Sequence, residues 1–349
     1  MAVGVPILQL VLFGYTINTD PKGLPTALVS TDASPIARSL VAAMQNTGYF
    51  HITRQPASEG EGDRLIEDGE VQFLIVIPPD FSRRLVRGEH PALLVSVDAT
   101  DPSAASNAVA ALGQLAPTAL QHELVGPLQS LRPGAAPFEL RIHKRYNPEG
   151  LSRYNIVPGL IGTILTMTML IFTALSVTRE IERGTMESLL SMPITPVEVM
   201  LGKIIPYVLV GFLQASIIIG IGVFLFGVPV MGSLLLLALL STLFIATNLS
   251  IGYTFSTLAQ NQLQAMQLSM MFFLPSILLS GFMFPFLGMP QWAQIVGECL
   301  PLTHYLRIVR AIMLKGSTLA NLQHDTIALF GLMLFAMTVA VLRFRRTLD

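Results

Sequence analysis

Long apolar stretches limit how this chain can fold more than any other feature of its sequence. An α-helix needs about 20 predominantly apolar residues to cross the hydrocarbon core of a bilayer. Four stretches of at least 22 residues contain no Asp, Glu, Lys or Arg, and they lie at about 156–177, 204–227, 233–257 and 264–287. A shorter apolar stretch at 326–342 precedes the basic run RFRR. We therefore expect five transmembrane helices in this part of the chain.

The first residues, MAVGVPILQLVLFGYTI, are also largely apolar. A cleaved signal peptide would carry a basic region and a small-residue cleavage site, and neither is visible in this stretch. We interpret residues 1–17 as a first transmembrane helix at the short end of the spanning range, N-terminally incomplete. The sequence then predicts six transmembrane helices in all.

Residues 18–155 differ in composition from the rest of the chain. They contain 27 of the 43 charged residues, whereas the remaining 211 residues contain 16. Short β-branched stretches within them predict strands at 26–30, 72–77, 92–98 and 138–143. The expected fold is thus a membrane all-α bundle of six helices with an α/β extracytoplasmic domain, residues 18–155, inserted between helices one and two. Residues 156–349 form the five-helix core.

Two helices of this α/β domain are predicted by their first residues. Ser34 precedes Pro35, and Asp101 precedes Pro102. Each pair places a good N-cap residue before a proline at the first helical position. Helices are therefore expected near 35–46 and 102–124.

Basic residues in short loops predict the orientation, because Lys and Arg favour the cytoplasmic side of a membrane protein. Six helices place both termini on one side. If that side is the cytoplasm, its short loops carry Arg179, Arg183, Lys203, Arg343, Arg345 and Arg346, against Arg307, Arg310 and Lys315 on the other side. This difference favours cytoplasmic termini, and it places residues 18–155 outside the cytoplasm.

The segment REIERGTMESLLSMPITPVEVMLGK, residues 179–203, contains seven charged residues between two apolar stretches. The preceding helix is expected to continue through Glu182 and to end at Gly184, since glycine tolerates a left-handed C-cap. A short helix from Thr185 then ends at Pro193. A capping box with proline at its first helical position, residues 195–198, starts the next helix. An ordinary solvated loop is the plainer interpretation, but such loops rarely need so many helix starts.

The sequence offers no catalytic site of a familiar kind. Lys203 ends a Gly-Lys pair like that of a nucleotide-binding P-loop, but Val197 and Ile204 replace the Gly and the Ser or Thr of that motif. The six histidines are scattered without metal-ligand spacing, and the single Cys299 rules out an internal disulfide or a cysteine-based metal cluster. We therefore expect no metal, no cofactor on this chain and no enzymatic activity of its own.

Other classes of function are disfavoured by charge. The net charge of −1 provides no basic field for nucleic acid. Helices two to six carry no ionisable residue between their ends, although a proton relay would need such groups there. Ser82, in the sequence PPDFS, fits a turn and helix cap better than a nucleophile. A transporter driven from outside the chain is more consistent with this pattern.

The charged segment resembles the cytoplasmic loop of the type-2 ABC exporter permeases. That loop contains a glycine, an acidic residue followed by two leucines, a proline and a terminal Gly-Lys, and here these are Gly184, Glu187, Leu189, Leu190, Pro193, Gly202 and Lys203. The stretches at 278–292 and 301–316 are similar to the family's fifth-helix exit and outer segment. The resemblance covers residues 150–349, and the domain before them resembles that of a bacterial subgroup that exports drugs and small molecules.

The resemblance implies a membrane subunit that contains no motor and has a separate cytoplasmic ABC ATPase as its partner. ATP-driven closure of two ATPase subunits would push a coupling helix within 179–203, and two permease subunits, as a homo- or heterodimer, would respond. The residues expected to couple to the ATPase are Arg179, Glu180, Glu182, Arg183, Gly184, Thr185, Glu187, Leu189, Leu190, Pro193, Glu198, Gly202 and Lys203.

The cargo expected from the resemblance is a drug-like, amphipathic or lipophilic small molecule, moved out of the cytoplasm or the membrane. Residues expected at the outer gate or along the path are Asn248, Gln264, Gln267, Ser280, Gly281, Pro285, Pro301 and His304. The implied location is a bacterial inner membrane, with both termini cytoplasmic and residues 18–155 periplasmic. Membrane lipid and a periplasmic adaptor are further candidate partners, and nucleic acid is not one.

A membrane-anchored ligand-binding or sensory protein without transport activity is the alternative function. The partner discriminates between the two, because an exporter needs an ATPase and a sensor does not. Small-residue pairs in the third span, Gly211 with Ala215 and Ser216 with Gly220, are compatible with contact between subunits. They are equally compatible with packing inside one subunit.

Overall fold

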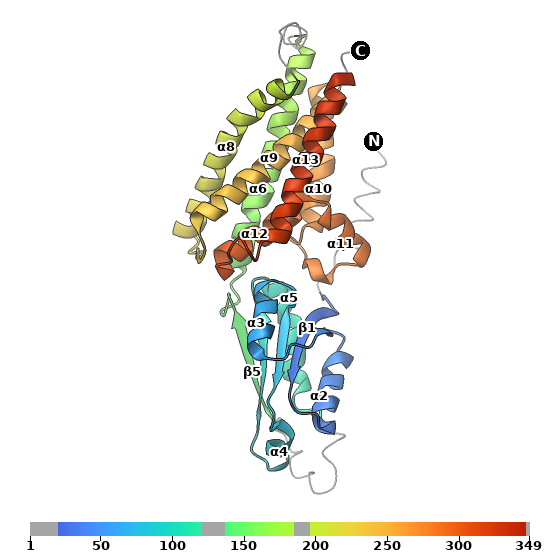
Figure 1. Ribbon diagram of the computed structural model, residues 1–349, viewed down its shortest axis with the longest axis vertical. Helices are drawn as coiled ribbons and strands as arrows, with labels where there is room; N and C mark the ends of the chain where they lie inside the picture. The colour runs from blue at the N-terminus through green and yellow to red at the C-terminus, as the bar shows by residue number, and fades with distance from the viewer. Residues whose placement is uncertain (1–19, 121–136, 185–195, 347–349) are drawn as a thin grey trace. The chain divides into compact units, whose positions relative to one another are not determined.

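The computed structural model describes residues 20–120, 137–184 and 196–346 (Figure 1). Contacts divide the chain into two compact units. The first is a sheet unit, Asn18–Ser152 with Leu287–Met289, and the second is a helical unit that contains Arg153–Phe286 and the chain from Pro290 onward. Each unit is described by itself.

The sheet unit alternates strands and helices. Its elements are β1 (Leu24–Ser30), α2 (Pro35–Asn46), β2 (Phe50–Arg54), α3 (Glu59–Glu67), β3 (Phe73–Ile77), α4 (Phe81–Val86), β4 (Ala92–Asp98), α5 (Pro102–Leu115) and β5 (Glu139–Arg145). The strand order is β2-β1-β3-β4-β5, and every neighbouring pair is parallel except β3 with β4. The crossover helices required by parallel strands cover the sheet.

Hydrophobic alternation and capping explain most of this unit. The four predicted strands are present, and the helix at 35–46 has the predicted bounds, with the Ser34 hydroxyl accepting from the Ala37 N–H at 3.2 Å. The predicted helix at 102–124 was too long, because α5 ends at Leu115 and turns follow it as far as Leu120. Three short elements, β2, α3 and α4, were not predicted. Their few residues carry little periodic signal.

The helical unit consists of long apolar helices and some shorter helical elements. Its elements are α6 (Ser152–Glu182), α8 (Pro196–Phe224), α9 (Leu234–Leu258), α10 (Gln262–Leu279), α11 (Gln291–Glu298), α12 (Pro301–Arg310), the π-helical turn η3 (Ala311–Lys315) and α13 (Gln323–Arg346). Within the described ranges, five helices are long and apolar enough to cross a membrane: α6, α8, α9, α10 and α13. The predicted first helix, residues 1–17, lies outside the described residues.

The fifth predicted span, 264–287, was wrong at its C-terminal end. Helix α10 ends at Leu279, and Gly281 follows with a φ of +83°. That left-handed conformation favours glycine and breaks the helix. The Phe286 side chain also lies close to Gly281, where an added Cβ would come within 3.0 Å of it. The chain therefore turns at this point instead of continuing through Leu287.

Most side chains of helix α12 are buried by neighbouring helices. It packs against α9, α10, α11 and α13. The ring of Tyr305 stacks on Phe244 of α9 with centroids 4.0 Å apart, and its hydroxyl shares a 2.8 Å hydrogen bond with Ser241. Gly162 of α6 allows this approach, because a Cβ there would come within 2.8 Å of Leu302. The apolar face of α12 is therefore covered by protein.

The small-residue pairs of α8 differ in their surroundings. Gly211 packs inside the unit, since an added Cβ would lie 2.9 Å from both Ile245 and Met169, and Ala215 is buried. Ser216 is exposed, and in the part of the chain that the structure describes no atom lies within 4 Å of a Cβ added at Gly220. Only the second pair therefore lies on the open face of α8.

Candidate functional site

The charged segment 179–203 begins and ends in the helices that its sequence predicts. Helix α6 ends at Glu182, and Gly184 has a φ of +71°. The Arg183 N–H donates to the Arg179 carbonyl at 3.1 Å, which closes the last turn. Helix α8 begins at Pro196. The expected short helix between them lies at 185–195, outside the described residues, and Thr185, Glu187, Leu189, Leu190 and Pro193 lie there too.

An ion pair joins the two helices that flank this segment. The Lys203 ammonium of α8 contacts the Glu180 carboxylate of α6. The Lys203 side chain is 14% exposed and that of Glu180 is 34% exposed, so the pair is partly shielded from water. Shielding makes such a pair stronger than a fully solvated one. The pair therefore ties the end of α6 to α8.

A second contact joins the end of α6 to the start of α10. The Glu182 carboxylate accepts from the Gln262 backbone N–H at 2.7 Å and also from the Gln262 side-chain amide. These hydrogen bonds lower the pKa of Glu182. The carboxylate lies at a helix N-terminus, where negative charge is favoured, and Asn261 caps the same helix through a 2.9 Å bond to the Gln264 N–H. The end of α6 is therefore held by two neighbouring helices.

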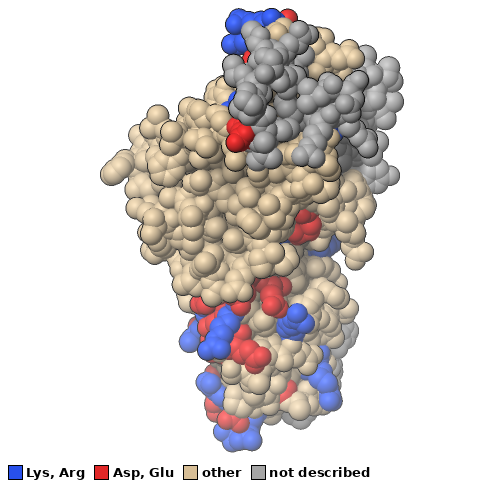
Figure 2. All heavy atoms as spheres, turned by 45° about the horizontal axis from the view of Figure 1, so that its top comes forward, with Lys and Arg blue, Asp and Glu red and all other residues tan. Residues whose placement is uncertain are grey.

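The other described residues of the expected coupling site lie on the surface. Those classed as exposed are Arg179, Arg183, Gly184, Glu198 and Gly202. Among the described residues, no atom lies within 4 Å of a Cβ added at Gly202, so their packing does not require glycine at that position. In Figure 2 the helical unit presents a broad face without charged side chains, and Lys and Arg gather at its upper end.

The residues expected at the outer gate or path do not form one cluster. Gln264 and Gln267 lie in the first turns of α10, near Glu182, and Gln264 accepts from the Gln260 N–H at 2.8 Å. At the other end of the unit lie Ser280, Gly281, Pro285, Pro301 and His304, all buried. Asn248 is fully buried within α9. These residues therefore lie at both ends of the helical unit and within α9, and not at one site.

Asn248 is a buried polar residue in a helix that can cross a membrane. Its side-chain amide donates to the Phe244 carbonyl at 3.0 Å. Within the described residues its Oδ1 atom has no hydrogen-bond partner. A buried amide oxygen without a partner is costly.

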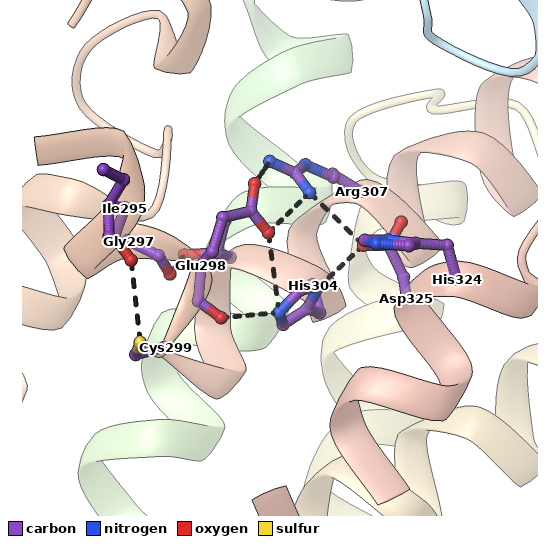
Figure 3. A network of polar contacts seen from close by, with 9 residues as sticks. Ile295, Gly297, Glu298, Cys299, His304, Arg307, His324 and Asp325 are labelled. Carbon is purple, nitrogen blue, oxygen red and sulfur yellow. Dashed lines mark hydrogen bonds and ion pairs between the residues drawn. The ribbon is translucent and has the colours of Figure 1, made fainter. Parts of the chain in front are cut away.

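His304 lies in a polar network at the end of the helical unit where α11, α12 and α13 meet (Figure 3). Its Nδ1 atom lies 2.7 Å from the Asp325 Oδ1, and its Nε2 atom lies 2.9 Å from the Glu298 carbonyl oxygen. Arg307 donates to both carboxylate oxygens of Glu298, at 2.5 and 3.2 Å, and more weakly to Asp325 at 3.4 Å. His324 Nδ1 lies 3.8 Å from the same Asp325 oxygen.

Arg307 is held firmly in this network. Its guanidinium also lies over the Phe286 ring, 4.6 Å from the centroid. Burial alone would lower the pKa of Arg307, but the hydrogen bonds and charges of Glu298 and Asp325 outweigh it and raise the pKa. The sequence predicted His304 as a site residue, but not its partners Glu298 and Asp325 or the Arg307 that binds both of them. No spacing rule joins residues from three separate helices.

Ser82 is tied to a carboxylate in the sheet unit. Asp32 accepts from the Ser34 N–H at 2.9 Å and from the Ser82 N–H at 2.8 Å, and the two serine hydroxyls contact each other. Partial burial would raise the pKa of Asp32, but these hydrogen bonds lower it to about 2. Such a carboxylate is a poor base. The arrangement fits the expected turn between elements and gives Ser82 no activating partner among its contacts.

Comparison with known proteins agrees with this architecture. Residues 1–342 match the model of the ABC-2 family transporter protein. The chain is 32% identical over its whole length to the probable multidrug ABC transporter permease YbhS of Escherichia coli, covering 92% of that protein. Over 90% of the chain it is 29% identical to YbhR, a probable multidrug ABC transporter permease of E. coli, covering 84% of it. Over 98% of the chain it is 28% identical to the inner membrane transport permease YhhJ of E. coli, covering 93% of it.

Proposed function

This chain belongs to the ABC-2 family of transporter proteins, and we propose that it is the membrane-spanning, non-catalytic subunit of an ATP-driven exporter. ATP is hydrolysed on a separate cytoplasmic ABC ATPase, which docks on residues 179–203. Two membrane subunits, identical or different, work as a pair. The cargo is a drug-like, amphipathic or lipophilic small molecule that moves out of the cytoplasm or the inner membrane.

The observation that best supports this proposal is the pair of polar contacts at the base of the charged segment. Glu180 binds Lys203 of α8, and Glu182 binds Gln262 of α10. A force applied to the exposed residues of the segment therefore reaches three membrane-capable helices at once. A simple connecting loop would not need its ends fastened to two neighbouring helices. This is the arrangement that a motor outside the chain requires.

Relatives support the class of cargo and the location. YbhS and YbhR are named as probable multidrug ABC transporter permeases, and YhhJ as an inner membrane permease. The distribution of basic residues in short loops favours cytoplasmic termini. In this orientation residues 18–155 are periplasmic, and the network around His304 faces the outer side. A periplasmic adaptor and lipid are further proposed partners.

Charge reversal at Arg183 tests where the ATPase docks. Arg183 is exposed, and it lies at the edge of the segment. We expect the Arg183→Glu chain to recover less ATPase from its native membrane and to lose transport of a fluorescent drug into inverted vesicles. The matched control is Arg343→Glu, because Arg343 is also exposed and is expected on the same side of the membrane. Its ATPase recovery and transport should match the wild type.

A second variant separates docking from transmission. Lys203→Met removes the ion pair with Glu180 but leaves the exposed surface unchanged. We expect normal recovery of the ATPase, with its hydrolysis no longer stimulated by cargo. If wild-type chain recovers no ATPase from native membranes, the exporter proposal fails, and a membrane-anchored binding or sensory protein becomes the better explanation. Equal transport by Arg183→Glu and Arg343→Glu would overturn the docking assignment alone.

A further inference from the structure

The network around His304 brings three possible metal ligands together from two helices. His304 belongs to α12, whereas His324 and Asp325 begin α13. One ligand atom from each of the three lies within 4.8 Å of the others. We propose that these residues bind a divalent transition-metal ion such as Zn²⁺, which fastens α12 to the start of α13. This goes beyond the proposed transport function and does not depend on it.

The first argument is the tautomer of His304. Its Nε2 atom faces the Glu298 carbonyl oxygen at 2.9 Å, and a carbonyl can only accept, so Nε2 carries a hydrogen. A neutral imidazole then presents an unprotonated Nδ1. Metal-bound histidines nearly always donate their second ring N–H to a carbonyl or carboxylate, which fixes the ring in this way. His304 is only 2% exposed, so its ring has a fixed direction.

The second argument is the short contact on the other side of the ring. Nδ1 of His304 lies 2.7 Å from Oδ1 of Asp325. An unprotonated nitrogen and a carboxylate oxygen both carry lone pairs, and they repel each other unless a positive charge lies between them or beside them. A proton or a metal ion can supply that charge. The presence of a third ligand atom favours the metal ion.

His324 provides that third atom. Its Nδ1 lies 3.8 Å from the same Asp325 oxygen, and the two histidine rings have centroids 6.3 Å apart. Bonds of about 2.0–2.2 Å to a tetrahedral ion place ligand atoms roughly 3.3 Å from one another. The two observed separations from Asp325 Oδ1, 2.7 Å to His304 and 3.8 Å to His324, lie on either side of that value. The His324 side chain is 83% exposed, so it can move inward without disturbing a core.

Charge in the network is compatible with a cation despite the nearby Arg307. The guanidinium makes its shorter bonds, 2.5 and 3.2 Å, to Glu298, and its contact with Asp325 is the longest at 3.4 Å. Arg307 and Glu298 thus neutralise each other. Asp325 then supplies the one carboxylate charge among the three ligands.

The ligand types indicate the class of metal. Two imidazole nitrogens and one carboxylate suit Zn²⁺, Cu²⁺ or Ni²⁺, whereas Mg²⁺ and Ca²⁺ prefer sites made only of oxygen. Three protein ligands leave a fourth position for water. His304 is buried in α12, and Asp325 lies in α13. The bound ion would therefore fix α12 against a helix that can cross the membrane. Its expected effect is greater rigidity at this end of the unit.

Zinc binding to the full-length protein tests the proposal. The chain is purified through a tag that contains no histidine, placed in lipid nanodiscs, freed of metal with a chelator and titrated calorimetrically with Zn²⁺. We expect one ion per chain, not displaced by excess Mg²⁺. Co²⁺ should give the absorption bands of a four-coordinate site. His324→Ala should weaken binding at least about tenfold, as should Asp325→Asn, since each removes a direct ligand.

His51→Ala is the matched control, because His51 is an exposed histidine of β2 in the sheet unit. It should bind Zn²⁺ like the wild type. The His324→Ala variant is expected to fold normally, since that side chain is mostly exposed, and a monodisperse chromatographic profile verifies this. Equal affinity of wild type and His324→Ala would overturn the proposal. So would the absence of binding, which would leave a proton between His304 and Asp325, or weak binding of several ions that no variant changes.

Discussion

At the scale of single residues, Asp32 shows how one carboxylate organises the end of a sheet. It follows β1, and it accepts hydrogen bonds from two backbone N–H groups, one before α2 and one in α4. These bonds favour its charged form and lower its pKa to about 2. The same contacts keep Ser34 and Ser82 side by side. Asp32, which no sequence motif singled out, thus links the ends of two neighbouring parallel strands.

Replacing Asp32 by Asn should weaken this corner of the sheet unit by about 1–2 kcal/mol at neutral pH. The folded-state pKa of Asp32 is below its ordinary value of 3.8, so the stabilisation is present above about pH 4 and is lost as pH falls toward 2. Hydrogen exchange of peptides that contain Ser82 measures it. We expect faster exchange in the variant than in the wild type at pH 7, and a clearly smaller difference between the two at pH 2.5, where part of the stabilisation has been lost.

Asp80→Asn is the control for this prediction. Asp80 is a nearby carboxylate whose partner, Arg83, is largely exposed, and such pairs contribute little. Its exchange should match the wild type at both pH values. If Asp32→Asn exchanges like the wild type at pH 7, the assigned role of the carboxylate is wrong.

At the scale of elements, the sequence predicted those with a strong local signal. Strand β4 and helix α2 have the predicted bounds, because alternation and an N-cap followed by proline are local properties. Three short elements with a weaker local pattern, β2, α3 and α4, were missed. Helix α10 was predicted too long, because its apolar composition continues past Gly281 although its backbone does not. Composition indicates what enters a membrane but not where a helix ends.

The close packing of α12 against α6 depends on one small residue in α6. Replacing Gly162 by Leu would place its side chain where Leu302 and Tyr305 lie. We expect a loss of stability of about 1–3 kcal/mol from overpacking, seen as a lower midpoint of thermal unfolding. Trp292 of α11 is the single tryptophan. Because α11 packs beside α12, its fluorescence maximum should shift as well.

Gly331→Leu serves as the comparison, since a Cβ at Gly331 of α13 meets no atom of the described residues within 4 Å. That variant should unfold at the wild-type temperature, with unchanged Trp292 emission. Equal behaviour of the two variants would mean that the approach of α12 to α6 is not tight.

At the scale of the whole molecule, labelling of one natural cysteine tests the proposed orientation in the membrane. Cys299 is the only cysteine of the chain, and its side chain is exposed at the end of α11. In the proposed orientation it faces the periplasm. A membrane-impermeant maleimide should therefore label the wild-type chain in intact cells.

A cysteine on the opposite side completes this test. In a Cys299→Ser chain that also carries Arg343→Cys, labelling should require permeabilised inner membranes. Cys299→Ser alone should stay unlabelled under both conditions. Labelling of the Arg343→Cys chain but not of the wild type in intact cells would reverse the orientation, and it would place residues 179–203 on the wrong side for a cytoplasmic ATPase.

The sequence by itself determined the membrane class, five of the helices, most of the sheet and the limits of the charged segment. These follow from apolar length, alternation and capping, all of which act between residues close in the chain. Only the tertiary structure decided that Glu180 binds Lys203, that Glu182 binds Gln262, and that His304 meets Glu298 and Asp325. Those contacts depend on how helices pack. Packing brings together residues that are 6 to 80 positions apart in the chain. Local sequence patterns do not predict contacts between residues so far apart.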